Sequence, residues 1–439
     1  MANTRLTRTF SSGSGTTFTT SFWVKRTGLG LGFLFEGYGS GTYDTECFFN
    51  SDDTLHFRNT SNSNYTFNLN PTRKFRDVNS YYHLLFQFIA SGDSGVYAKI
   101  YVNGIQETVF TTNTQGAGGT QWNNTAPCTI GASHEGNYNF NGIISHFHHC
   151  DGTALAPTVF GETDATTGEW KIKTSPTFTL GTNGFTILKD GNTITDQSSN
   201  SNDWSLGGGT LTKTEDCPDN VFATMNPLEN HQQQGTYTNG NNTYQTNSSN
   251  YTYNTATLGV NSGKFYWEVE YDAKSGGVNY PQVGITSTQT TNTNQELGNF
   301  ANDWGYGEYD TSPKLRNNNT DAVWGSAYVE GDIIGVALDC DNNKLYFSKN
   351  GTWQESGNPT AGSGGISITA PSSTPLGFYF PSVAYYDGTN NGTFKANFGN
   401  GYFGTTAVSS AGTNASNNGI FEYDVPTGYT ALSTKGLNL

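Results

Sequence analysis

The sequence has few charged residues, and most of them are acidic. Charged residues make up 13% of the 439 residues, about half the usual share in a soluble domain. The 36 Asp and Glu residues outnumber the 21 Lys and Arg residues, giving a formal net charge of -15. No basic stretch exists, and binding to nucleic acid needs clustered Lys and Arg. We therefore expect no nucleic-acid partner and no attraction to an anionic cell surface, unless neutral sugars, aromatic stacking or bridging cations supply the contact.

Long apolar runs and closely spaced cysteines are also missing. The first residues, Met1 to Arg5, lack the basic-then-apolar pattern of a signal peptide, and no run approaches a membrane-spanning length. The five cysteines are scattered, without the close pairs of a zinc site or a disulfide scaffold. These absences predict synthesis in the cytoplasm, no membrane insertion and reduced, mostly packed thiols.

Aromatic residues are abundant by contrast. The chain has 28 Phe, 25 Tyr and 8 Trp but only 2 Met, so ring side chains supply most of the core volume. Aromatic residues favour strands over helices, and no segment of useful length shows a helical period. A chain of this length exceeds what one hydrophobic core usually organises. The composition predicts an all-β protein of two antiparallel β-sandwich domains with a jelly-roll-like arrangement.

Alternation of apolar and polar residues marks individual strands. In residues 96–102, the even-numbered residues are apolar and point one way, and Asn103-Gly104 then supplies a tight hairpin. In residues 265–272, Phe265, Trp267, Val269 and Tyr271 share one predicted core face, which leaves Tyr266 and three carboxylates on the other. Further strands are expected at residues 18–25, 81–90, 333–340 and 344–348.

A break in this rhythm at Cys217-Pro218-Asp219-Asn220 predicts the domain boundary. The polar stretch at residues 230–250 follows it, and we interpret this stretch as a solvated hairpin of the second domain. The predicted domains are residues 1–217, with a C-terminal extension of the sandwich, and residues 218–439.

Two groups of segments resemble known domain families. Residues 21–26, 83–86, 100–104 and 140–144, closed by Asp151-Gly152, resemble a laminin-G-like domain of the concanavalin A type. Residues 263–270, 283–286, 331–336, 347–351 and 397–399 look like a SPRY domain. Three connecting segments, residues 181–185, 220–227 and 425–429, are similar to junctions in virion and tail-fibre-like proteins of marine bacteriophages.

This resemblance implies a phage structural protein, made in the host cytoplasm and located in the virion. We expect a tail fibre, appendage or capsid-attached protein that binds a host-surface glycan or protein and contacts other virion proteins, without enzymatic activity. Such appendages are commonly homo-oligomers. A purely structural role in virion assembly is the alternative, and a glycoside hydrolase is a third hypothesis.

The hydrolase hypothesis depends on Glu268, Glu270 and Asp272. Their alternation puts three carboxylates on one strand face, and retaining hydrolysis needs two carboxyl groups close together across a sugar. Their spacing differs from the Glu-x-Asp-x-x-Glu row of concanavalin-type hydrolases, so a structural role is preferred.

Metal binding stays unknown from the sequence. His146 and His148 alternate on one strand beside Cys150, which suits zinc, but no second ligand cluster is evident and packing is the preferred interpretation. No cofactor is expected. Calcium is the one open alternative, because some laminin-G-like domains bind it and Asp44 or Asp93 in loops could contribute oxygen ligands.

The aromatic residues Trp304, Tyr306, Tyr309 and Trp324 are the predicted ligand-binding set. They fall in a Gly- and Asn-rich region where ring faces could stack on sugars or grip a peptide. The other interpretation is that these rings pack beneath long loops.

Overall fold

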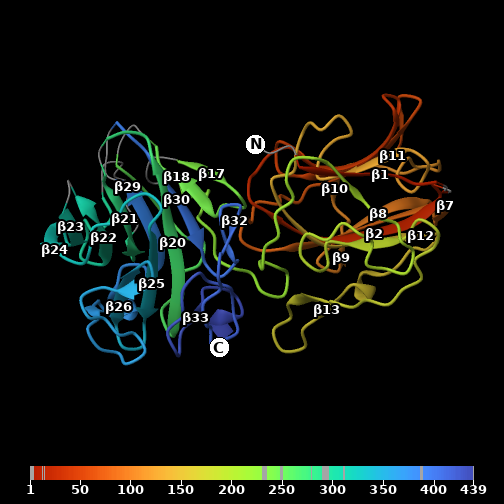
Figure 1. Ribbon diagram of the computed structural model, residues 1–439. Helices are drawn as coiled ribbons and strands as arrows, with labels where there is room; N and C mark the ends of the chain where they lie inside the picture. The colour runs from red at the N-terminus through yellow and green to blue at the C-terminus, as the bar shows by residue number, and fades with distance from the viewer. Residues whose placement is uncertain are drawn as a thin grey trace. The chain divides into compact units, whose positions relative to one another are not determined.

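The computed structural model divides the chain into two compact units, each built mainly from two largely antiparallel sheets (Figure 1). Unit 1 comprises Met1–Lys213 and Cys217–Asp219, and unit 2 comprises Thr214–Asp216 and Asn220–Leu439. The structure describes residues 4–11, 13, 15–229, 235–247, 251–277, 279–288, 296–309, 312–385 and 389–438.

The all-β prediction is confirmed. In the described ranges, the helices are the short 3-10 turns η1 (Pro157–Val159), η2 (Pro371–Ser373) and η3 (Gly436–Asn438). No helix in the described part of the chain is long and apolar enough to cross a membrane.

Unit 1 stacks a sheet of eight strands on a sheet of six. In spatial order, the larger sheet contains β10 (Phe110–Thr114), β6 (Asn64–Pro71), β5 (Leu55–Ser61), β4 (Tyr43–Phe49), β3 (Gly32–Ser40), β11 (Pro127–Ile130), β1 (Arg5–Thr9) and β16 (Ser205–Gly208). The smaller sheet contains β15 (Phe185–Ile187), β12 (Gly142–Asp151), β2 (Thr17–Arg26), β7 (Tyr82–Asp93), β8 (Val96–Val102) and β9 (Ile105–Gln106). Figure 1 shows β1 and β11 in one layer and β2, β8 and β12 in the other.

Phenylalanine fills the space between these sheets. Phe22 stacks on Phe147 with ring centroids 4.7 Å apart, and Phe35 contacts Trp122 at 4.6 Å. The predicted alternation in β8 is observed: Ala98, Ile100 and Val102 are buried, while the residues between them are half-buried. The Asn103-Gly104 turn has the positive φ angles, 48° and 79°, that a tight hairpin requires.

A further hairpin lies on the outer face of the six-stranded sheet. It pairs β13 (Gly161–Thr163) with β14 (Trp170–Ile172), and Trp170 donates its indole N–H to His83 of β7. His83 faces outward beside Trp23, with their rings stacked 5.0 Å apart. This face of the sheet is therefore covered by the chain itself.

Unit 2 repeats the two-sheet plan. Its larger sheet contains β17 (Thr236–Thr238), β18 (Thr243–Gln245), β30 (Gly392–Asn397), β20 (Lys264–Lys274), β25 (Ile333–Asp339), β26 (Lys344–Lys349) and β27 (Thr352–Trp353), with β28 (Ile366–Ser367) on β26 and β33 (Thr430–Ala431) on β20. The second sheet contains β19 (Thr252–Thr255), β29 (Phe380–Tyr385), β21 (Pro281–Thr286), β22 (Asp303–Tyr309), β23 (Ser312–Asn317) and β24 (Thr320–Val323). A separate ribbon pairs β31 (Tyr402–Phe403) with β32 (Thr406–Ala407).

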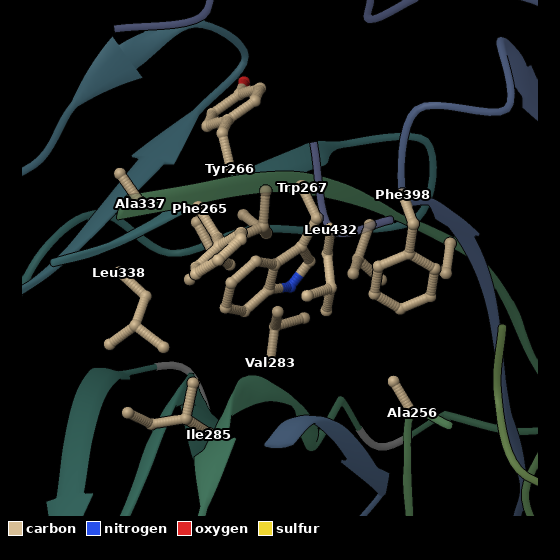
Figure 2. Packing of buried hydrophobic residues seen from close by; sticks show 14 of the residues in the cluster. Ala256, Phe265, Tyr266, Trp267, Val283, Ile285, Ala337, Leu338, Phe398 and Leu432 are labelled. Carbon is tan, nitrogen blue, oxygen red and sulfur yellow. The ribbon is translucent and has the colours of Figure 1, made fainter. Parts of the chain in front are cut away.

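Strand β20 shows how alternation builds this core. Figure 2 shows Phe265 and Trp267 pointing toward Val283 and Ile285, while Tyr266 points to the other side of the strand. Tyr266 is nevertheless fully buried, because its ring packs against that of Phe421, with centroids 5.1 Å apart. Both faces of β20 are therefore covered, whereas the sequence predicted only one.

The polar stretch after the boundary forms the predicted hairpin. Strands β17 and β18 pair with each other, and β18 pairs with β30 of unit 2. Residues 230–234 and 248–250 of this stretch lie outside the described residues.

Residues far apart in the sequence close unit 2. The strand β33 runs parallel to β20, with Phe265 opposite Thr430, and Phe222 forms a bridge with Ser433. This parallel pair is a departure from the antiparallel pattern that alternation alone predicts.

Candidate functional site

Aromatic side chains and one arginine cross the outer face of the eight-stranded sheet of unit 1. We call this row the aromatic strip and define it as Tyr138, Phe33, Phe48, Arg58 and Tyr65. Ring centroids are 5.8 Å apart between Tyr138 and Phe33 and 4.8 Å apart between Phe33 and Phe48. The Arg58 guanidinium carbon lies 5.0 Å from the Phe48 ring centre and 5.6 Å from that of Tyr65.

The register of β3, β4 and β5 explains why these side chains share a face. Phe33 lies opposite Phe48, and a bulge then turns both Leu34 and Phe35 into the core. On β4, Cys47 and Phe49 enter the core, so Phe48 between them points outward. On β5, Arg58 lies opposite Glu46, which precedes Phe48 by two residues on β4 and shares its outward face.

The two ends of the strip are its most exposed positions. Tyr138 is 56% exposed and Tyr65 is 49% exposed, whereas Phe33 and Phe48 are buried beneath their neighbours. The Arg58 side chain is fixed by its ion pair with Glu46 and by donation to the Tyr65 hydroxyl at 3.3 Å. The strip therefore presents two exposed rings held on a rigid base.

Three carboxylates adjoin the strip. Glu36 lies directly opposite Glu46 across β3 and β4, and Asp44 is two residues from Glu46 on the same face. Burial raises the pKa of Glu36 to about 8, and the neighbouring carboxylates add to this effect. The backbone N–H of His134 donates to Glu36 and partly offsets the rise. Burial and the nearby Glu46 raise the pKa of Asp44 to about 6. Arg58 is the cation paired with this group.

A second aromatic contact borders the carboxylates. The rings of Tyr38 and His134 are stacked with centroids 4.1 Å apart, and both residues are half-buried. Tyr38 follows Glu36 by two residues, so it stands on the same outer face of β3. The face thus combines ring surfaces with acceptors and donors, which is the chemistry that binds a sugar ring and its hydroxyl groups.

The structure does not gather the predicted ligand-binding set into one open surface. Trp304 and Tyr306 of β22 are buried in the unit 2 core, where Trp304 meets Tyr379 with ring centroids 5.8 Å apart. Trp324 is half-buried with its edge against Tyr306 and Phe347. The side chain of Tyr309 lies outside the described residues. The packing alternative describes these buried rings, because alternate residues of β22 point inward.

The three carboxylates of β20 differ in burial and in bonding partners. Glu268 is fully buried and accepts from the backbone N–H groups of Glu422 and Tyr423, each at 2.9 Å. Glu270 and Asp272 instead form ion pairs with Lys395, at 3.5 and 2.5 Å. Because Glu268 is buried, these described side chains do not form the open row of three carboxylates that alternation suggested.

The histidines of β12 are packed and hydrogen-bonded. Nδ1 of His148 lies 2.9 Å from the Thr186 hydroxyl, Nδ1 of His146 lies 2.7 Å from the Ser145 hydroxyl, and the Cys150 thiol donates to the Thr179 carbonyl. Burial lowers the pKa of His146 to about 4 and that of His148 to about 3.

Neither carboxylate suggested for calcium lies in a described cluster of metal-ligating side chains. Asp44 lies within β4 and not in a loop, because the turn falls at Gly41 and Thr42. Asp93 ends β7 and pairs with Lys99 at 2.9 Å. Within the described ranges, no group of three or more His, Cys, Asp or Glu side chains is arranged to hold a metal ion.

Sequence reasoning missed the aromatic strip, although a signal was present. Glu36 and Tyr38 alternate on one strand, and Asp44 and Glu46 alternate on the next, which marks an outer face rich in acids and rings. Tyr138 and Tyr65 come from a loop and a bulged pairing, and alternation does not locate such positions.

Two family models match separate parts of the chain. Residues 3–160 match the concanavalin A-like lectin/glucanases superfamily, in its laminin-G-like form, and residues 264–401 match the SPRY domain. The chain therefore contains a concanavalin A-like domain and a SPRY domain, as the sequence motifs predicted. No curated protein matches the chain.

Solved structures that match part of the chain include the SPRY domain of human HERC1, which is 19% identical; the match covers 39% of this chain and 96% of that domain, with a TM-score of 0.28. Stonustoxin is 22% identical, with a TM-score of 0.28; the match covers 40% of this chain and only 27% of the toxin chain. A heptameric SAP-like pentraxin from Limulus polyphemus is 15% identical, covers 35% of this chain and 71% of its own, and has a TM-score of 0.27.

Proposed function

We propose that this protein, which carries a concanavalin A-like and a SPRY domain, binds glycans through the aromatic strip of unit 1. The observation that supports this proposal best is the pair of exposed rings, Tyr65 and Tyr138, at the ends of a rigid row of stacked groups. Sugars present flat C–H faces that pack on aromatic rings, and their hydroxyl groups can bond to the half-buried side chains of Arg58 and Asp44 beside the rings.

The charge of the chain favours a neutral glycan as the ligand. The net charge is -15, and Asp44 and Glu46 lie beside the strip with Arg58 as their paired cation, while Glu36, with a pKa of about 8, keeps its proton at pH 7. An anionic sugar would meet like charge both at long range and at the site. A neutral sugar meets no such penalty.

Binding without cleavage fits the accessibility of the carboxylates. Glu36 and Glu46 face each other, but they are only 5% and 8% exposed. A glycosidic bond must lie between the two carboxyl groups of a hydrolase. The buried pair leaves no access for that bond, so we propose a binding protein and not an enzyme.

We further propose that the protein is a virion component, such as a tail fibre, appendage or capsid-attached protein, and that it attaches to host-surface glycans. Support comes from the connecting segments at residues 181–185, 220–227 and 425–429, which resemble junctions in phage virion proteins. Homo-oligomerisation would multiply weak sugar contacts. Mass spectrometry of purified particles tests this placement, and absence of the chain from intact particles would refute it.

A glycan array probed with the full chain tests the binding proposal. We expect signals on neutral glycans that fall about tenfold, or ~1.4 kcal/mol, when Tyr65→Ala or Tyr138→Ala removes one exposed ring. Both rings are exposed, so the variants should keep the fold.

The matched control is Ile105→Ala, which removes an apolar side chain that is 67% exposed on the other sheet of unit 1. This variant should bind like the wild type. Binding that is undiminished by loss of both tyrosines would overturn the assignment, and silence of the wild type at high avidity would favour the assembly role.

A further inference from the structure

A row of four side chains crosses the outer face of the eight-stranded sheet in unit 1. We call it the Asp44 row and define it as Tyr38, Asp44, Thr60 and Tyr65. Tyr38 lies opposite Asp44 across β3 and β4, and Thr60 lies opposite Asp44 across β4 and β5. Thr60 in turn lies opposite Tyr65 of β6. Directly opposite residues of an antiparallel sheet point to the same side, so the row ends on a ring of the aromatic strip.

A bulge explains why Tyr65 joins this face. Asn59 of β5 lies opposite Phe67, but the next residue of β5 lies opposite Tyr65, so β6 has one extra residue at this point. Phe67 points into the core, and without the bulge alternation would send Tyr65 the same way. The bulge turns Tyr65 outward instead, where it is 49% exposed.

The two polar side chains in the middle of the row have free hydrogen-bonding groups. The Asp44 carboxylate forms no hydrogen bond or ion pair with the described residues, although the side chain is half-buried. Its Oδ1 atom is enclosed, which leaves Oδ2 as the oxygen that solvent reaches. Thr60 is also half-buried, and its hydroxyl makes no hydrogen bond within the described ranges. An acceptor and a hydroxyl group therefore lie side by side between two tyrosine rings.

The neighbouring charges set the protonation of Asp44. The titratable and charged groups on the surrounding elements are Glu36 and Tyr38 of β3, Glu46 of β4, Arg58 of β5, Tyr65 of β6 and His134 of the adjoining loop. Burial and Glu46 raise the pKa of Asp44 to about 6, while Arg58 lowers it. Asp44 is therefore mostly ionised at pH 7 and mostly protonated at pH 5. Arg58 also disfavours a cationic ligand beside this carboxylate.

From this arrangement we infer that ionised Asp44 accepts a hydrogen bond from a hydroxyl group of the sugar bound at the strip, and that it makes binding depend on pH. This inference rests on the proposed sugar binding by unit 1 and names the residue that selects the ligand. An ionised carboxylate only accepts, so the ligand must donate, and the Thr60 hydroxyl can bond to a neighbouring hydroxyl of the same sugar. Hydrogen bonds to a charged group are about twice as strong as those between neutral groups, so a proton on Asp44 weakens binding.

Ligand titrations by NMR on the full chain test this role with the methyl glycosides of glucose, galactose, mannose and N-acetylglucosamine. We expect the wild type to bind about tenfold more weakly at pH 5 than at pH 7, because the ionised fraction of a carboxyl group with a pKa of about 6 falls by that factor. Asp44→Asn should bind weakly and equally at both pH values. The matched control, Asp93→Asn, changes a carboxylate at the end of β7 in the other sheet and should keep the wild-type profile.

A second probe needs no variant. Per-O-methylated glycosides of the same sugars keep the ring and its oxygen acceptors but cannot donate. They should bind the wild type about tenfold more weakly than the parent glycosides at pH 7, because the hydrogen bond to the charged carboxylate is lost. At pH 5 the difference should be smaller.

The outcomes separate this role from the proposed function. No binding of any glycoside at either pH would refute sugar binding and, with it, the role of Asp44. Equal binding by the wild type at both pH values, or a pH dependence that persists in Asp44→Asn, would overturn the role of Asp44 while sugar binding stands. Persistence would assign the pH dependence to His134 or Glu36. Equal binding of methylated and parent glycosides at pH 7 would overturn the requirement for a donating hydroxyl.

Discussion

The indole Nε1 of Trp170 lies 3.0 Å from Nδ1 of His83 and joins the outer hairpin of unit 1 to its six-stranded sheet. Because indole N–H only donates, Nδ1 of His83 must accept, and its Nε2–H then donates to the Ser21 hydroxyl at 2.8 Å. The contact therefore requires neutral histidine, and burial lowers the pKa of His83 to about 3.

This contact predicts acid sensitivity of unit 1. Between the ordinary histidine pKa of about 6.5 and the folded value of about 3, the unfolded chain binds a proton that the folded chain does not. The free energy of unfolding should thus fall as pH decreases through this window, by up to ~1.4 kcal/mol per pH unit from this residue. His83→Gln keeps an acceptor and a donor without titrating, so urea unfolding at pH 7 and pH 5 should show a smaller loss than in the wild type. An unchanged loss would contradict this account. Trp170→Phe should instead lower stability at both pH values by about 1–3 kcal/mol.

Gly104 makes room for the same tryptophan. A Cβ atom there would lie 2.6 Å from the Trp170 ring, and φ is +79°. Gly104→Ala should destabilise unit 1 by about 1–3 kcal/mol beyond the backbone cost. Gly95→Ala isolates that backbone cost, because Gly95 has φ +84° and nothing within 4 Å of the added atom. Thermal melts of the two variants give the difference, and equal melting temperatures would refute the steric role of Trp170.

The C-terminal segment that covers β20 should respond to pH in the opposite sense. Burial raises the pKa of Glu268 to about 7 from an ordinary value of 4.5. The folded chain then keeps a proton that the unfolded chain has released, so unit 2 should lose stability as pH rises from about 4.5 to 7. Glu268→Gln should flatten this dependence in denaturant titrations, whereas Glu355→Gln, at an exposed position, should not. A wild-type slope in Glu268→Gln would show that Glu268 does not titrate in this range.

A buried ion pair offers a sharp comparison between adjacent residues. Arg26, which is 1% exposed, donates to Asp53 at 3.1 Å and to the Phe75 carbonyl at 2.6 Å. Asp53→Asn leaves the guanidinium without its counter-charge and should cost about 3–5 kcal/mol. The neighbouring pair of Asp52 and Lys74 is largely exposed, so Asp52→Asn should cost at most about 1 kcal/mol. Similar losses in the two variants, measured by urea unfolding, would contradict the distinction.

Local patterns in the sequence predict most strands but not what covers them. Alternation finds β8 and β20, and Asn-Gly pairs find hairpins, because both signals depend on neighbours in the chain. The prediction placed Tyr266 and Glu268 on the strand face opposite the core, but residues 420–423, distant in the sequence, bury them there. Alternation shows that side chains of one strand point to opposite sides, without showing which side meets a second layer.

The candidate sites show the same limit. Trp304 and Tyr306 were predicted to bind a ligand because of their rings, yet the outward positions of β22 are the glycines that alternate with them. Deciding which set points outward requires the pairing of β22 with β21 and β23. The aromatic strip needs still more, because a bulge in β3 and a loop residue, Tyr138, complete it.

The bridge between Phe222 and Ser433 joins the beginning and the end of unit 2, so this unit can close only after its last residues have been translated. While a ribosome is still translating unit 2, β20 has already emerged but the segment that forms β33 has not. A nascent chain at that stage exposes apolar strand faces and unpaired edges, which favour association with other chains. Pairing between segments that are far apart in the sequence also slows folding. Yield of soluble protein should therefore depend on slow translation or on chaperones more than on the stability of the finished fold.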